Sequence, residues 1–166
     1  MSLKIQIADA LAKLQGLSST APTTAGWSLP ASVEFEVDFT GVDRMSCSFS
    51  ELRVRGDALQ NGPFDRLKVW ADELCRRVTY LLEHIAPLEA DSADETVLIR
   101  STPPTRSPDE TTFYETVLKA PGLLSLKRYR NTPQNGREAI DMQMTHEVLQ
   151  KLVQDITDSL PAPTAA

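Results

Sequence analysis

Histidine and cysteine are scarce in this sequence, with two of each among 166 residues. Neither His84 nor His146 belongs to a catalytic or metal-binding motif, and Cys47 and Cys75 lack the paired spacing of a zinc site. A histidine at either end of a helix is commonly exposed or interacts with the helix dipole. We therefore expect no catalytic residue, no metal and no cofactor, and two buried thiols that stay reduced.

The motifs of common enzyme classes are also missing. The sequence has no glycine-rich phosphate loop followed by lysine, no GxSxG, no HExxH and no EF-hand loop. The sequence therefore leaves enzymatic activity open and favours a protein that is not an enzyme.

Long apolar runs and an excess of positive charge are absent as well. No stretch approaches the roughly 20 apolar residues that span a bilayer, and Gln6, Asp9 and Lys13 interrupt the first apolar segment, so we expect no signal peptide. Lys and Arg number 17 against 23 Asp and Glu, which gives a net charge of −6. This charge disfavours nucleic acid and anionic membranes as partners, and the unpaired cysteines favour a cytoplasmic location.

Helical patterns are present in three segments. The most regular one covers residues 63–85, where apolar residues recur at spacings of three and four after the cap-compatible Asn61 and Gly62. A second covers 146–159 and follows Thr145, a residue type that caps helices. The third is a short amphipathic helix within residues 1–16, which is marginal in water alone.

Alternating patterns predict several antiparallel strands. Residues 33–40 and 44–50 alternate between apolar and polar side chains around a turn, and a change of phase predicts a bulge near Ser50 and Glu51. Further strands are expected at 96–101, 111–119, 123–131 and 140–144. We expect the hairpin face with Phe35 and Val37 to pack under the helix of residues 63–85.

These elements predict an α+β fold: an antiparallel sheet of about five to six strands, with helices 63–85 and 146–159 on one face and a short N-terminal helix. The chain divides into an N-terminal helix (1–16), a linker (17–31), a single α+β domain (32–160) and a disordered tail (161–166). The linker assignment rests on its Ser, Thr, Ala and Pro content.

One group of basic residues stands out in this acidic chain. Lys127, Arg128 and Arg130 lie on one predicted strand, and Arg137 follows the next turn. Such a cluster can hold a phosphate or an acidic segment, and pairing with nearby carboxylates is the alternative. With the proline-rich loop 101–110, it forms the candidate anion site.

A second candidate surface lies near the N-terminus. Leu3, Ile7 and Leu11 share one face of the predicted helix, and Trp27 interrupts the bland linker, either to pin it to the domain or to contact a partner. We therefore predict a non-catalytic protein-binding or assembly module, which binds another protein or itself as a homodimer. The alternative is a small-ligand or anion-binding domain, conceivably an enzyme, at residues 127–130 and 101–110.

Overall fold

The computed structural model describes residues 2–56, 64–120 and 122–161. Three α-helices occur in these ranges: α1 (Leu3–Leu14), α2 (Phe64–Arg77) and α3 (His146–Ser159). The Thr145 hydroxyl accepts a hydrogen bond from the Val148 amide and caps α3, as the sequence predicts.

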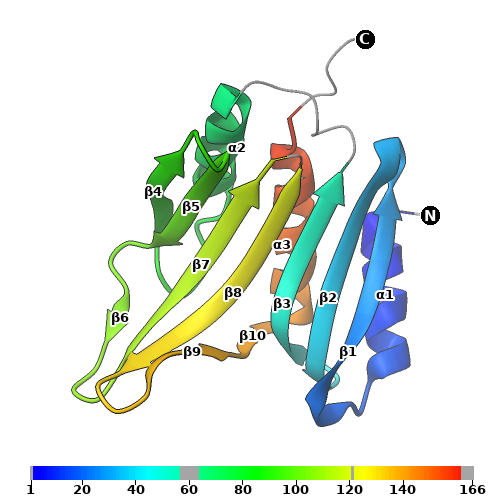
Figure 1. Cartoon of the computed structure of the whole chain (residues 1–166). Coiled ribbons are helices and arrows are strands. Elements are labelled where there is room, and N and C mark those ends of the chain that lie inside the picture. The colour runs from blue at the N-terminus through cyan, green and yellow to red at the C-terminus, as the bar shows by residue number, and fades with distance from the viewer. Residues whose placement is uncertain (1, 57–63, 121, 162–166) are drawn as a thin grey trace.

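The described strands form one antiparallel sheet of ten strands (Figure 1). They are β1 (Ser18–Leu29), β2 (Val33–Val42), β3 (Ser46–Gly56), β4 (Ile85–Asp91), β5 (Thr96–Ser101), β6 (Thr105–Arg106), β7 (Thr111–Lys119), β8 (Leu123–Thr132), β9 (Gly136–Ile140) and β10 (Met142–Thr145). The main order is β1-β2-β3-β8-β7-β5-β4, while β10 pairs with β3, β6 with β7 and β9 with β8. Strands β1 and β4 are therefore the two edges of the main path.

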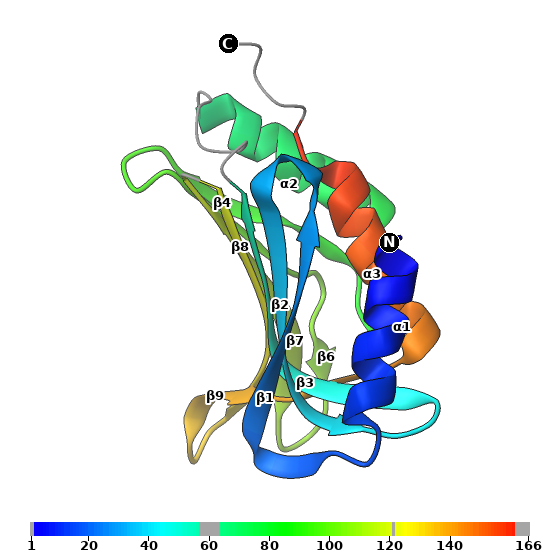
Figure 2. The ribbon, with the colours of Figure 1, turned by 90° about the vertical axis from the view of Figure 1, so that its right-hand side faces the viewer.

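All three described helices lie on one face of the sheet (Figure 2). The strand sequences explain why that face is covered: in β2, Phe35 and Val37 are fully buried, whereas Glu34 and Glu36 point to the opposite face. The α+β prediction with helices on one face is confirmed. The predicted count of five to six strands is too low. The predicted linker forms β1, the residues before the predicted strand 96–101 form β4, the proline-rich loop forms β6, and the residues before the predicted strand 140–144 form β9.

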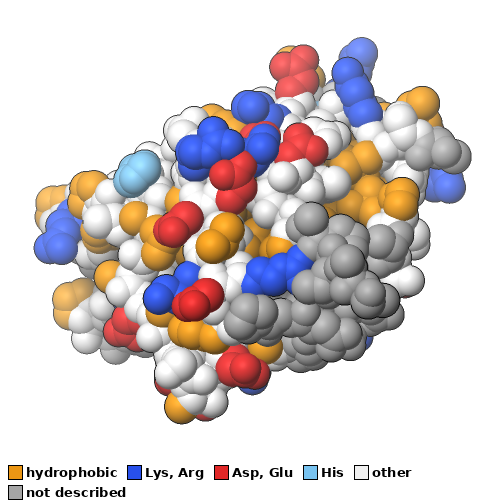
Figure 3. Space-filling model, turned by 90° about the horizontal axis from the view of Figure 1, so that it is seen from above, with side chains coloured by type: hydrophobic (Ala, Val, Ile, Leu, Met, Phe, Trp, Pro, Cys, Tyr) orange, Lys and Arg blue, Asp and Glu red, His pale blue; other side chains and the backbone are white. Residues whose placement is uncertain are grey.

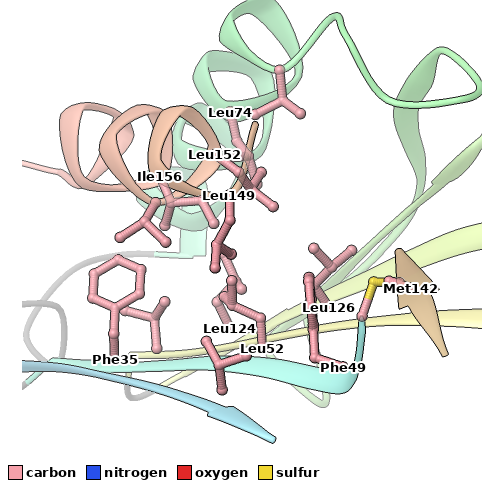
Figure 4. Packing of buried hydrophobic residues seen from close by; sticks show 14 of the residues in the cluster. Phe35, Phe49, Leu52, Leu74, Leu124, Leu126, Met142, Leu149, Leu152 and Ile156 are labelled. Atoms are coloured by element: carbon pink, nitrogen blue, oxygen red, sulfur yellow. The ribbon is translucent and has the colours of Figure 1, made fainter. Parts of the chain in front are cut away.

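The core lies between the sheet and the helices (Figure 4). Ile156 of α3 points toward Phe35 of β2, and Leu149 of α3 points toward the sheet near Leu52 of β3. Helix α2 instead contacts β4, β5 and β7. The prediction that α2 covers the β2–β3 hairpin is therefore wrong, because the chain leaves α2 toward the far edge of the sheet.

Helix α2 ends at Arg77, well before the predicted residue 85. The apolar spacing continues past this point because Val78 and Ile85 are buried in the core without being helical. Glu83, between them, turns inward and accepts a hydrogen bond from the buried Arg128. The predicted helix start at Asn61 to Pro63 lies outside the described residues.

Residues 17–31, predicted to be a linker, are mostly strand. β1 pairs with β2 in unbroken register from Thr23 to Leu29, with Trp27 opposite Phe35. The sequence predicts a linker here because the Ser, Thr and Ala content of the segment is typical of one. The segment forms a strand because β2 offers it an edge with which to pair, not because its own residues favour a strand. Of the predicted disordered tail, residues 162–166 lie outside the described residues.

The predicted bulge in the β2–β3 hairpin is confirmed. Asp38 lies opposite Glu51 and Phe39 opposite Phe49, so Ser50 has no partner across the pair. Because Ser50 is an extra residue in β3, Phe49 and Leu52 can both point to the buried face of the sheet although they are three positions apart. Both residues are consequently fully buried.

Candidate functional site

The predicted anion site is occupied by a carboxylate of the chain itself. Arg128 lies on β8 and makes two hydrogen bonds to Glu83, with Nη1 to Oε1 at 2.9 Å and Nη2 to Oε2 at 3.0 Å. Ser101 and Thr105 donate from the loop side, at 2.8 and 2.7 Å. The basic strand and loop 101–110 therefore do meet, and Glu83 joins them.

This pair is deeply buried and fully hydrogen-bonded. The side chains of Arg128 and Glu83 are 7% and 4% exposed, and the guanidinium of Arg128 lies 4.2 Å from the centre of the Tyr114 ring. Burial would raise the pKa of Glu83, but the hydrogen bonds from Arg128, Thr105 and Ser101 outweigh it and hold the pKa below its ordinary value. The geometry is that of an internal clip between segment 78–84, loop 101–110 and the sheet.

The other predicted cations also face carboxylates. Arg130 pairs with Glu138 at 3.0 Å, and the Lys127 amine is 3.9 Å from Glu51. These distances are those of the cross-strand pairing that the sequence offered as the alternative to an anion site.

Arg137 takes part in a small cluster on the helix-free face. It reaches the Glu115 carboxylate at 2.7 Å and lies 3.7 Å from the centre of the Tyr129 ring, while Arg100 approaches the same carboxylate at 2.8 Å. Anion binding at Lys127, Arg128, Arg130 and Arg137 thus stays a prediction, and each of these cations has a carboxylate of the chain beside it.

Glu83 is the residue that sequence reasoning missed. It lies in the run Tyr80 to Ile85, which reads as the end of a helix. A single carboxylate within an apolar run signals a buried, paired charge. That signal identifies Glu83, although the sequence does not say which cation it meets.

The helix-free face of the sheet carries a second charge network. Arg53 makes hydrogen bonds to Asp38, Glu36 and Glu51, with the shortest at 2.6 Å to Asp38. The Arg53 hydrogen bond is the main cause that holds the pKa of Asp38 below its ordinary value. Seen from above, Lys and Arg side chains are likewise interspersed with Asp and Glu (Figure 3). Charge on these two surfaces is therefore paired rather than gathered into one patch.

The partner-surface candidates near the N-terminus lie in the core of the chain itself. Ile7, Leu11 and Trp27 are 1%, 2% and 4% exposed, and Leu3 packs partly buried beside them. The Trp27 indole N–H donates to the backbone oxygen of Gln6 at 3.1 Å. Helix α1 thus packs on its own sheet through these side chains. In this conformation its apolar face is therefore buried and cannot contact a partner.

The same docking creates a different surface at the β1 edge. Within residues 2–56, 64–120 and 122–161, no strand pairs with the outer side of β1. Its sequence, SSTAPTTAGWSL, has no charged residue. An edge of this kind presents main-chain N–H and C=O groups that can pair with another strand.

A groove of about 340 Å³ runs along this edge, in the corner between α1 and β1. Its lining contains small, polar and apolar residues and two exposed charged ones, Asp9 and Lys13; the others are Gln6, Ala10, Leu14, Ala25, Gly26 and Trp27. Helix α1 lies behind β1 and partly beyond it in Figure 1, and Figure 2 views the same corner from the side. We call β1 and this groove the β1 edge site.

The described ranges contain neither a cluster of metal ligands nor a membrane-spanning helix. No group of three or more His, Cys, Asp or Glu side chains there is arranged to hold a metal ion, and no helix there is long and apolar enough to cross a bilayer. Cys47 and Cys75 are free and buried, and burial raises the pKa of each thiol to about 12.

Comparison with protein families, with curated proteins and with solved structures finds no match for this chain.

Proposed function

We propose that this chain is a non-catalytic protein-binding module that takes up an extended segment of another polypeptide at the β1 edge site. The observation that carries the proposal is the uncharged outer side of β1, which no strand in the described ranges covers. Addition of a strand to such an edge is a recurrent mode of peptide recognition.

The site is built on a rigid support. Trp27 packs edge-on against Phe39, with ring centroids 6.5 Å apart, and its indole N–H holds α1 through Gln6. Residues Thr23 to Leu29 keep an unbroken register with β2. Because β1 is already ordered, an incoming segment loses its own conformational freedom while the site loses little.

Main-chain hydrogen bonds would supply most of the affinity in this mode, and side chains in the groove would supply the selectivity. A chain that works this way needs no catalytic group, metal or cofactor. A cytoplasmic location, favoured by the two free thiols, belongs to the same proposal.

The anion-binding alternative has weaker support. A phosphate at Arg128 would have to displace Glu83. The Glu83 carboxylate already accepts hydrogen bonds from both Nη1 and Nη2 of Arg128, at 2.9 and 3.0 Å. Displacement would leave a buried carboxylate without its cation, a change that is strongly unfavourable.

Selection from a library of displayed random 12-residue peptides tests the proposed function. Enriched peptides should bind the purified chain and shift backbone amide signals of Thr23 to Leu29 in NMR spectra. The Glu83–Arg128 region serves as the internal reference, because its amides should not move. Enriched peptides that shift other strands and leave β1 unchanged, or a failure to enrich any peptide, would overturn the proposal.

A further inference from the structure

We infer that the β1 edge site accepts one antiparallel strand of about seven residues, whose side chains facing α1 are small and uncharged. This inference rests on the proposed function and adds the length, number and chemistry of what binds there.

The length follows from the register of β1. The pairing of β1 with β2 is continuous from Thr23 to Leu29 and shifts between Ser18 and Thr23. Before that shift, the Ala21 amide is already bonded to the Ser19 hydroxyl, and Pro22 has no N–H to donate. The segment that can extend the sheet is therefore Thr23–Leu29, which matches a partner of about seven residues.

The position of α1 argues for a single strand rather than for a second copy of this chain. In a two-fold pairing of β1 with β1, the two strands would lie about 4.8 Å apart, whereas two packed helices need about 8–10 Å between their axes. Helix α1 lies behind β1 and partly beyond it (Figure 1), so two copies of α1 would compete for the same space. A lone strand fits beside β1 with α1 above it.

The groove lining sets the chemistry of the side chains that face α1. Ala10, Leu14 and Ala25 are half-buried there, and Trp27 closes the inner wall. A charged side chain on this side would lose water without gaining a buried partner, since Asp9 and Lys13 are exposed. Side chains on the opposite side of the added strand would lie beside Thr24, Gly26 and Ser28 in solvent, where charge is tolerated.

Designed peptides test the inference directly. The probe is a blocked heptapeptide, Val-Thr-Ala-Thr-Ala-Thr-Val, whose valines and alanines would face α1. Replacing both alanines by glutamate should weaken binding by about tenfold or more, whereas replacing two threonines by glutamate should change it little. Calorimetry gives the affinities, and amide shifts in Thr23–Leu29 confirm the place of binding.

N-methylated peptides separate strand addition from binding of side chains alone. In an antiparallel pair, alternate N–H groups point to the neighbouring strand. One peptide is methylated at its three threonines and another at its two alanines and last valine, and one of the two should lose binding while the other keeps it. Equal affinities for the two would overturn the inference.

A matched pair of chain variants locates the groove. Ala10→Arg places a large charged side chain in the corner and should abolish shifts at Thr23–Leu29, whereas Ala8→Arg makes the same change on an exposed flank of α1 and should not. Thermal melting checks that both variants fold. Equal binding by the two folded variants, or a complex that contains two copies of the chain joined at β1, would overturn the inference. Library peptides that bind β1 without the predicted side-chain preference would refute this inference and leave the proposed function standing.

Discussion

The two edge strands of the main path of the sheet, β1 and β4, differ in how they resist pairing with another strand. β4 carries Pro87, Glu89 and Asp91 and has a register shift between Pro87 and Glu89, all of which discourage pairing with another strand. β1 has no charge, and its one proline, Pro22, precedes the segment in continuous register. Within the described ranges, β4 therefore carries features that oppose strand pairing, whereas segment Thr23–Leu29 of β1 carries none of them.

The anchors behind the two edges differ as well. The β4 side is held by the buried pair of Glu83 and Arg128, whose four hydrogen bonds to each other and to Ser101 and Thr105 are 3.0 Å or shorter. The β1 side is held by Trp27 and the apolar face of α1. A polar clip is sensitive to the loss of either partner, whereas an apolar anchor loses stability in proportion to the contact removed.

Removing one partner of the polar clip should have the largest effect. Glu83→Ala leaves the buried Arg128 charge without its carboxylate and should cost about 3–5 kcal/mol of unfolding free energy. Urea denaturation measures the loss, and hydrogen exchange should show β4 and β5 opening before β1. The double variant Glu83→Leu/Arg128→Met is the control and should recover most of the stability, since it buries no unpaired charge. A single-variant loss below about 1 kcal/mol would show that the pair is not a clip.

Changing the apolar anchor should have a smaller effect. Trp27→Phe keeps an aromatic ring against Phe39 but removes the N–H that donates to the Gln6 oxygen, and it should cost about 1–3 kcal/mol. Hydrogen exchange should now show α1 opening first, with β4 unchanged. Faster exchange of β4 than of α1 in this variant would contradict the comparison between the edges.

Acid should weaken the buried pair of Glu83 and Arg128. The pKa of Glu83 is lower in the folded chain than its ordinary value near 4.5, so its contribution to stability is present above that value and is lost as the pH falls through the folded pKa. Asp38 behaves alike, because Arg53 lowers its pKa. Below about pH 4.5, stability should fall less steeply in the Glu83→Leu/Arg128→Met variant than in the parent chain. Identical pH profiles from denaturation at several pH values would contradict this.

The sequence predicts those parts of the fold that depend on neighbouring residues, and it misses those that depend on residues far away in the chain. The β2–β3 hairpin, the bulge at Ser50 and the Thr145 cap are local, because each depends on residues within a few positions. β1 is not local: its Ser, Thr and Ala residues become a strand because β2 presents an edge. The segment after α2 is likewise held by a contact that is not local, since Glu83 meets Arg128, 45 positions away.

The candidate sites follow the same division. The sequence correctly places strand 127–130 beside loop 101–110, but the carboxylate that joins them comes from a third segment. Trp27, Ile7 and Leu11 have the composition of a partner surface, and whether they face a partner or the core is decided by where α1 docks. The β1 edge site could not be read from residue types, since it is made of main-chain groups that lack a neighbour in the described ranges.

The smallest effect on stability is expected from the hydrogen bond that joins β1 to the charge network of the helix-free face. The Thr24 hydroxyl donates to Asp38 at 2.7 Å, and Asp38 in turn accepts from Arg53. Thr24→Val keeps the β-branched shape and removes this bond, which is exposed, so the loss should be about 0.5–1 kcal/mol. Thr23→Val is the matched control, since the Thr23 hydroxyl makes no such bond within the described residues and its replacement should leave stability nearly unchanged. Both variants should bind the heptapeptide as the parent does, because strand addition uses the main chain of β1. A loss above about 2 kcal/mol in urea denaturation of Thr24→Val would mean that the open edge is held by its polar side chains rather than by Trp27 and the main chain.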